Sequence, residues 1–172
     1  MSAVRTPAAE DEPPRLAPMT AAGLDAVMAL ETGVYPFPWT RGNFIDSLAA
    51  GYVAQLLCDG RGGHLLGYFV ALAGVDEMHL LNITVAPPHR RQGHARRMMD
   101  ALIERSRAAC AHRIWLEVRV SNEVALAVYQ RWGFREQGLR PGYYPAAHGR
   151  REDAVVMSLD IDPRGQRPDG LD

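Results

Sequence analysis

Cysteine is scarce in this chain, which has only Cys58 and Cys110 among its 172 residues. The two form no CxxC pair, and the six histidines include no HExxH arrangement. We therefore expect neither a disulfide framework nor a metal site. A reduced, cytoplasmic compartment fits this cysteine usage better than an oxidising one.

Long apolar runs and an excess of charge of one sign are also missing. No stretch approaches the roughly 20 apolar residues that span a bilayer, and the first fifteen residues lack the apolar centre of a secretory signal. Lysine and arginine number 19 against 20 aspartates and glutamates, which gives a formal net charge of −1. This balance argues against broad binding to nucleic acid or anionic lipid. We expect no membrane partner and no direct nucleic-acid binding.

The remaining composition is that of one globular domain. The chain is 47% hydrophobic and 23% charged, close to the average for such proteins. Residues 1–14 are rich in alanine, proline and acidic side chains, and residues 163–172 are similar. We predict a domain over residues 15–162, a disordered tail on each side of it, and a monomer.

Hydrophobic periodicity predicts an α/β sandwich on a mixed sheet. Helices are expected after the candidate N-caps Thr20, Thr40 and Asn122, and a further helix after Gly93. The predicted strands cover residues 52–58, 64–73, 78–85, 114–120, 134–139 and 154–161.

Residues 80–96, LLNITVAPPHRRQGHAR, predict a buried strand, a proline break and a basic turn that opens a helix. The first N–H groups of a helix lack partners within it, and the helix dipole favours negative charge there. Arg90, Arg91 and Arg96 surround Gly93, whose missing side chain leaves room for a ligand. The pattern is neither a P-loop nor a dinucleotide fingerprint. It fits a pyrophosphate site, and a solvated basic turn is the alternative.

Glu117 is a carboxylate between apolar neighbours in a predicted strand. Burial costs free energy unless the group is paired, solvated or protonated, and it would raise the pKa towards that of a general base. The alternative is an ion pair with Arg119 or with a neighbouring strand. Tyr129, in the next helix, is either a proton donor or a core residue, and Asn122 is either an N-cap or a ligand contact.

Together these residues resemble a known family, the GCN5-related N-acetyltransferases (GNAT). Arg90, Gly93 and Ala95 match its [Q/R]xxGx[G/A] motif. Within the family, the chain is similar to the bacterial RimI type, which acetylates the N-terminal alanine of a ribosomal protein. The similarity covers roughly residues 16–161, and its most specific segments are FPW, NITVAPPHRRQGHA, WLEVRVSNEVALAVYQRWGF and GYYP followed by REDA.

The resemblance implies a mixed, mostly antiparallel sheet of about six to seven strands, flanked by about four helices. It also implies an acetyl-CoA site without a metal, in which Glu117 is the general base and Tyr129 the general acid. The residues expected to bind acetyl-CoA are Ile83, Thr84, Val85, Arg91, Gln92, Gly93, His94, Ala95, Arg96 and Asn122.

The implied acceptor is the N-terminal alanine of small-subunit ribosomal protein 18. A lysine side chain or a small amine remains an alternative acceptor, and a non-catalytic acyl-CoA-binding module is an alternative class. Two departures from the family pattern lie near the expected acceptor groove. The chain has GRREDA, with an added arginine at Arg150 or Arg151, in place of GREDA, and Gly142 stands where asparagine is common.

Overall fold

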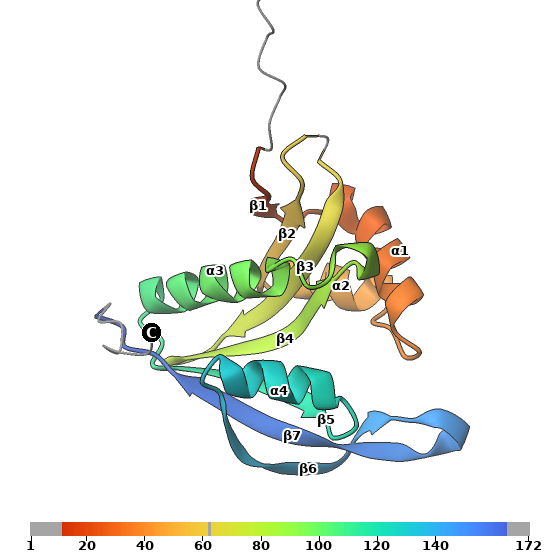
Figure 1. Cartoon of the computed structure of the whole chain (residues 1–172), viewed down its shortest axis with the longest axis vertical. Coiled ribbons are helices and arrows are strands. Elements are labelled where there is room, and N and C mark those ends of the chain that lie inside the picture. The colour runs from red at the N-terminus through yellow and green to blue at the C-terminus, as the bar shows by residue number, and fades with distance from the viewer. Residues whose placement is uncertain (1–11, 62, 165–172) are drawn as a thin grey trace, which may run out of the picture.

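A seven-stranded mixed sheet organises the computed structural model, which describes residues 12–61 and 63–164 (Figure 1). Its strand order is β1-β2-β3-β4-β5-β7-β6, and within the described residues β4 and β5 form the one parallel pair. The strands are β1 (Arg15–Pro18), β2 (Val53–Cys58), β3 (Leu65–Ala73), β4 (Glu77–Val85), β5 (Arg113–Arg119), β6 (Arg135–Pro145) and β7 (Arg151–Asp160).

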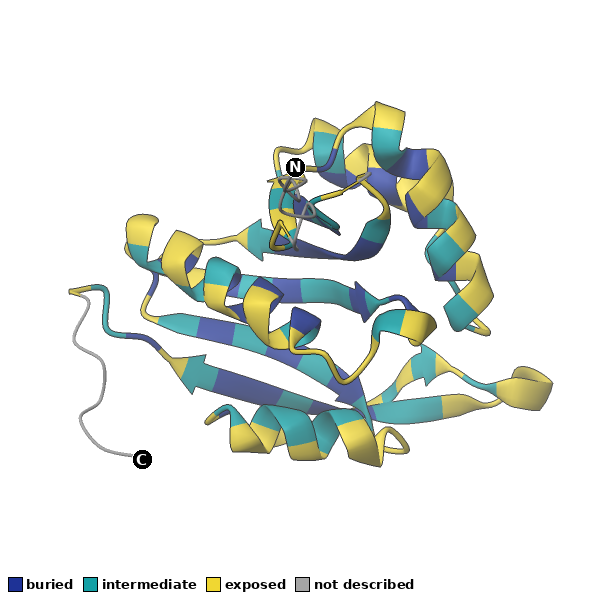
Figure 2. Cartoon of the chain, turned by 45° about the horizontal axis from the view of Figure 1, so that its top comes forward, coloured by how far each residue is buried: buried dark blue, intermediate teal, exposed yellow. Residues whose placement is uncertain are grey.

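Within the described residues, four α-helices cover the two faces of this sheet. They are α1 (Leu24–Val34), α2 (Arg41–Ala49), α3 (His94–Ala108) and α4 (Glu123–Arg131), with short 3-10 turns at Ala21–Gly23, Pro87–His89 and Ala147–Gly149. The buried residues of α1, α2 and α3 lie against the strands and their exposed residues face outward, whereas α4 has only exposed and half-buried residues (Figure 2). No helix in the described ranges combines the length and the apolar character needed to cross a membrane.

The core has two layers, one on each face of the sheet. Alternate residues of β3 divide between them, because successive side chains of a strand point to opposite faces. Phe69 packs with Met98 and Leu102 of α3, whereas Tyr68 packs with Val27 of α1 and Phe44 of α2. The sheet is therefore buried on both sides at its centre, as its apolar central strands indicate.

Several element boundaries differ from the sequence prediction. The strand β1 was not predicted, because four residues at a sheet edge carry no clear periodicity. The strand β6 extends to Pro145 and so includes the GYYP segment, which was expected to be a loop. Thr20 makes no side-chain cap, whereas the Thr40 and Asn122 side chains both cap as expected. The predicted tails fall mostly outside the described residues.

The middle of β4 contains an irregularity that shapes the site. Val70 of β3 pairs with Asn82 and Ala71 pairs with Leu80, so Leu81 is an extra residue in the ladder. The pairing of β4 with β5 ends at His79 and Trp115, and the strands diverge beyond that point (Figure 1). The last residues of β4 therefore have no backbone partner on β5.

Candidate active site

The basic turn, residues 90–96, connects β4 to α3. Arg91 and Gly93 both have positive φ angles, 60° and 81°, which aim the chain into the first turn of α3. No side chain in the described part of the protein caps the N-terminus of α3. A Cβ atom placed on Gly93 would meet no other atom within 4 Å, so the space beside it is open. Unpartnered N–H groups beside open space suit the phosphates of a ligand.

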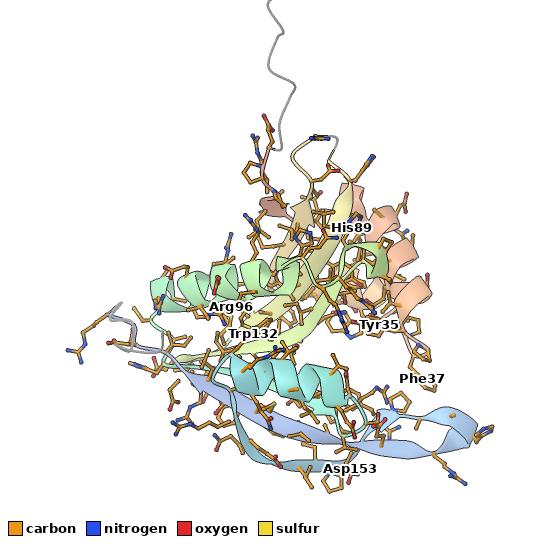
Figure 3. All side chains as sticks on the ribbon, in the orientation of Figure 1. Tyr35, Phe37, His89, Arg96, Trp132 and Asp153 are labelled. Atoms are coloured by element: carbon orange, nitrogen blue, oxygen red, sulfur yellow. The ribbon has the colours of Figure 1, made fainter. Side chains whose placement is uncertain are left out.

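Two of the cations of this turn, Arg90 and Arg96, have defined partners. Arg90 Nε donates to the Val85 carbonyl at 3.4 Å. Arg96 pairs with Asp100 at 3.0 Å and lies 5.5 Å from the Trp132 ring, just beyond the end of α4 (Figure 3). The Arg96 guanidinium therefore links the first turn of α3 to the end of α4.

The other residues of the turn divide into exposed and buried groups. Gln92 is exposed, as are Arg91 and Gly93, whereas Ala95 is half-buried. His94 is buried, and its pKa is lowered by desolvation and then by the nearby His89 and Arg97. The His94 ring is therefore neutral at neutral pH and adds no charge to the turn.

The side chain of Thr84, at the end of β4, is engaged in hydrogen bonds within the protein. Thr84 is buried, its hydroxyl donates to Asn82 Oδ1 at 2.9 Å, and it shares a 2.8 Å hydrogen bond with the Tyr35 hydroxyl. The Thr84 side chain is therefore occupied within the protein, which leaves its backbone groups for contact with a cofactor arm. Tyr35 itself, which the sequence did not single out, also donates to the Ile83 carbonyl at 3.5 Å.

Glu117 lies on β5 where this strand separates from β4. Its side chain is only 6% exposed, its Oε2 lies 2.5 Å from His79 Nε2, and its Oε1 lies 3.4 Å from Arg140 Nη2. Arg119, one of the partners considered from the sequence, is instead bound to Glu152 at 3.1 Å. Glu117 is thus a paired carboxylate whose partners come from β4 and β6.

Tyr129 lies on α4, with its ring against the rings of Trp132 and Phe134. Burial, and then the neighbouring phenols of Tyr35 and Tyr144, raise its pKa well above the ordinary value of 10.0. Its hydroxyl makes no hydrogen bond within the described residues, so the phenol keeps its proton and has no partner to give it to. Both the core position and the proton-donor hypothesis from the sequence fit this placement.

Asn122 stands at the N-terminus of α4. Its Oδ1 accepts from the Ala125 N–H at 3.2 Å, so it is an N-cap. The residue is exposed, and its amide nitrogen has no bond in the described structure, so a ligand contact would not break the cap.

Arg119 joins two aromatic segments that flank Glu117. Its guanidinium lies 5.8 Å from the Phe37 ring, in the α1–α2 loop, and 4.5 Å from the Tyr144 ring of β6. It also donates to the Pro145 carbonyl at 2.8 Å. The FPW and GYYP segments identified in the sequence therefore approach each other through Arg119, which the sequence offered only as an alternative partner for Glu117.

Gly142, one departure from the family pattern, contacts Arg151, one of the two arginines of the GRREDA segment. Gly142 has a φ of 59°, and its N–H donates to Asp153 Oδ1 at 2.8 Å. Arg151 donates from Nε to the Gly142 carbonyl at 2.5 Å and from Nη2 to the Tyr143 carbonyl at 2.9 Å. Arg151 thereby fixes the backbone of the GYYP segment against β7.

A buried carboxylate that the sequence did not identify supports the α1–α2 loop. Glu31 is 1% exposed and accepts from the Trp39 N–H at 2.9 Å, from Asn82 Nδ2 at 3.2 Å and from the Tyr68 hydroxyl. Its position at the end of a predicted helix gave no signal of burial. Since Asn82 also binds Thr84, one hydrogen-bonded network runs from α1 to the end of β4.

Residues 24–134 match the model of the acetyltransferase (GNAT) family, which is more than half of the chain. The chain belongs to the GNAT family. The structure confirms the expected fold, a mixed seven-stranded sheet with four helices, and the family assignment confirms the expectation of an N-acetyltransferase enzyme.

Named GNAT relatives are similar over most of this chain. It is 35% identical to the [ribosomal protein bS18]-alanine N-acetyltransferase of Escherichia coli over 138 residues, which cover 80% of the chain and 91% of the relative. It is 31% identical to a putative enzyme of the same name from Bacillus subtilis over 80% of the chain and 89% of the relative. These similarities confirm the resemblance to the RimI type.

Solved structures agree with this assignment. The crystal structure of the ribosomal-protein-S18-alanine N-acetyltransferase from Escherichia coli superposes with a TM-score of 0.79 at 31% identity, covering 92% of this chain and 99% of that one. Arabidopsis thaliana NAA60 in complex with acetyl-CoA has a TM-score of 0.76 at 17% identity, covering 87% of this chain and all of that one, which shows a shared fold. Acetyl-CoA is the co-substrate of the GNAT family.

Proposed function

We propose that this GNAT enzyme transfers the acetyl group of acetyl-CoA to the N-terminal α-amine of a protein, with the N-terminal alanine of ribosomal protein bS18 as its acceptor. The observation that carries the acceptor is the 35% identity, over 91% of its length, to the Escherichia coli enzyme named for that reaction. The geometry around Glu117 supports the chemistry.

The basic turn is the proposed site for the pyrophosphate of acetyl-CoA. Backbone N–H groups from Arg91 to Arg96 supply hydrogen bonds, the open space at Gly93 admits the phosphates, and the arginines supply charge. Backbone groups of Ile83 to Val85 hold the pantetheine arm and the thioester, and Asn122 contacts the arm from α4. We expect no metal, and no covalent enzyme intermediate is required.

Glu117 is the proposed general base. A protein N-terminal amine has a pKa of about 7.7–8.0, so at neutral pH most of it carries a proton that must leave before attack. The carboxylate of Glu117 accepts this proton directly or through water, and the freed amine attacks the acetyl carbonyl. Backbone donors near Val85 polarise that carbonyl oxygen.

Tyr129 is the proposed general acid. The raised pKa of its phenol keeps it protonated at neutral pH, so a proton is available when the thiolate leaves. The phenol comes from α4, and the carboxylate comes from β5, beyond the point where β5 stops pairing with β4.

The acceptor segment is proposed to lie between the α1–α2 loop and the β6–β7 hairpin. The Phe37 ring is 44% exposed and the Tyr143 ring 41% exposed, which leaves aromatic surface on both segments for a peptide. An extended chain can also pair through its backbone with a splayed strand edge where β4 and β5 diverge. A free lysine or a polyamine has no peptide backbone for that pairing.

A comparison of acceptors tests this proposal. We expect kcat/KM for a peptide with the alanine-first N-terminus of bS18 to exceed that for free lysine, spermidine and an N-terminally blocked peptide with an internal lysine. A value for spermidine that equals or exceeds the peptide value would remove the ribosomal acceptor and leave only the acetyltransferase assignment. Acetyl-CoA binding without turnover of any acceptor would favour a binding module instead.

A further inference from the structure

His79 is the residue of β4 that contacts Glu117. Its Nε2 lies 2.5 Å from Glu117 Oε2, and its place in the parallel register opposite Trp115 puts it on the same face of the sheet as Glu117. The two side chains differ in their access to water: 29% of the His79 side chain is exposed, against 6% for Glu117. His79 therefore reaches from the buried carboxylate to solvent.

The reaction, on the function proposed above, releases one proton in every turnover. The acceptor ammonium has three N–H bonds and the amide product has one. As the N–C bond forms and the C–S bond breaks, one of the two lost protons goes to the sulfur of CoA. The other is the proton that Glu117 takes from the ammonium, and it must reach solvent. Glu117 is too buried to pass this proton directly to bulk water.

The other groups around Glu117 are poor proton acceptors. Arg140, 3.4 Å away, carries a guanidinium that is always protonated. Tyr144 donates its hydroxyl to the Glu117 backbone carbonyl at 3.0 Å. Burial raises the pKa of both Tyr143 and Tyr144, so each phenol keeps its proton. Of the side chains that contact Glu117 in the described structure, the His79 ring alone has two nitrogens, one of which can accept a proton while the other releases one.

We propose that His79 is a proton relay that takes the acceptor's proton from Glu117 and releases it to solvent. After each turnover Glu117 is thereby returned to the carboxylate form that the next acceptor needs. The relay acts through Glu117 and does not touch the reacting atoms, so its loss slows turnover without removing the base.

The test uses His79→Gln and His79→Ala in the full chain. Glutamine keeps an N–H group near Glu117 but cannot relay a proton, whereas alanine leaves space for added imidazole. We expect kcat to fall about tenfold in both, less than the 10²–10⁴-fold loss of a general base, with the KM for acetyl-CoA unchanged. Added imidazole should restore the rate of His79→Ala in a concentration-dependent way.

His112→Gln is the matched control. His112 is exposed and directly precedes β5, whereas Glu117 lies in the second half of that strand, and the replacement of His112 should leave kcat unchanged. Thermal unfolding of each variant shows whether the fold is kept. A wild-type kcat in His79→Gln, or a rate of His79→Ala that does not respond to imidazole, would overturn the relay and leave His79 an orienting partner.

Glu117→Gln separates this inference from the proposed function. We expect it to be nearly inactive at every imidazole concentration. A normal rate in Glu117→Gln would remove the base assignment itself, whereas an inactive Glu117→Gln together with a fully active His79→Gln would remove only the relay.

Discussion

Two side chains with opposite tasks define the proposed chemistry at the residue scale. Glu117 lies between His79 and Arg140, and Tyr129 is packed among aromatic rings with its hydroxyl unpartnered in the described structure. The apolar neighbours of Glu117 predicted its burial. Its partners could not be predicted, because they come from strands far away in sequence and the pairing depends on where β4 and β5 diverge.

Tyr129→Phe tests the general acid. The variant loses only a hydroxyl without a partner in the described structure, so we expect unchanged thermal stability and unchanged acetyl-CoA affinity, with kcat lower by about 10²-fold. Because the pKa of Tyr129 is raised, its proton should be present throughout the range below about pH 10.

The wild-type pH profile completes this test. Tyr129 should cause no fall in kcat on the alkaline side below about pH 10. A Tyr129→Phe variant with wild-type turnover would return this tyrosine to the core role that its helical spacing also predicts.

At the scale of elements, the N-terminus of α3 carries the proposed cofactor site. Its sequence signal was strong, because a strand, a proline break and a glycine turn follow one another within residues 80–96. The sequence did not reveal that Arg91 also adopts a positive φ or that Arg96 reaches Trp132 near α4. The contact between Arg96 and Trp132 depends on how α3 packs beside the end of α4, which local patterns do not encode.

Gly93→Ala tests the basic turn. A methyl group there enters the open space proposed for the pyrophosphate, and we expect acetyl-CoA to bind at least about tenfold more weakly by calorimetry, since charge-assisted hydrogen bonds are lost.

Gly51→Ala is the control for that variant. Gly51 has a φ of 78°, close to the 81° of Gly93, and equally open surroundings, so both variants carry similar backbone strain of about 1–2 kcal/mol. Gly51 follows α2, and the Gly51→Ala variant should leave acetyl-CoA affinity unchanged. Equal affinities in the two variants would argue against a pyrophosphate at Gly93.

The strands differ in how well the sequence predicts them. The apolar runs of β3 and β4 and the alternation of β5 marked them clearly. The strand β6 is mostly exposed, so no hydrophobic period indicates its full length, and its backbone pairing with β7 alone extends it through the GYYP segment. The extra residue Leu81 in β4 left no recognisable signal either.

The whole molecule brings four sequence segments together where β4 and β5 diverge. The basic turn lies at the end of β4, Glu117 lies on β5, and Arg119 connects the α1–α2 loop with the β6–β7 hairpin. The family resemblance predicted the basic turn and Glu117 as participants, but not the role of Arg119. The contact of Gly142 with Arg151, which sets the backbone beside the expected acceptor, is a feature of this chain that only the structure reveals.

The most direct measurement of the central claim locates the acetyl group on one acceptor that offers both kinds of amine. A peptide with the alanine-first N-terminus of bS18 and an internal lysine is incubated with acetyl-CoA and the enzyme, and the product is sequenced by tandem mass spectrometry. The account predicts a single acetyl group on the α-amine of the alanine, formed by the wild-type enzyme and nearly absent with Glu117→Gln. Acetylation of the lysine with the α-amine left free would contradict it.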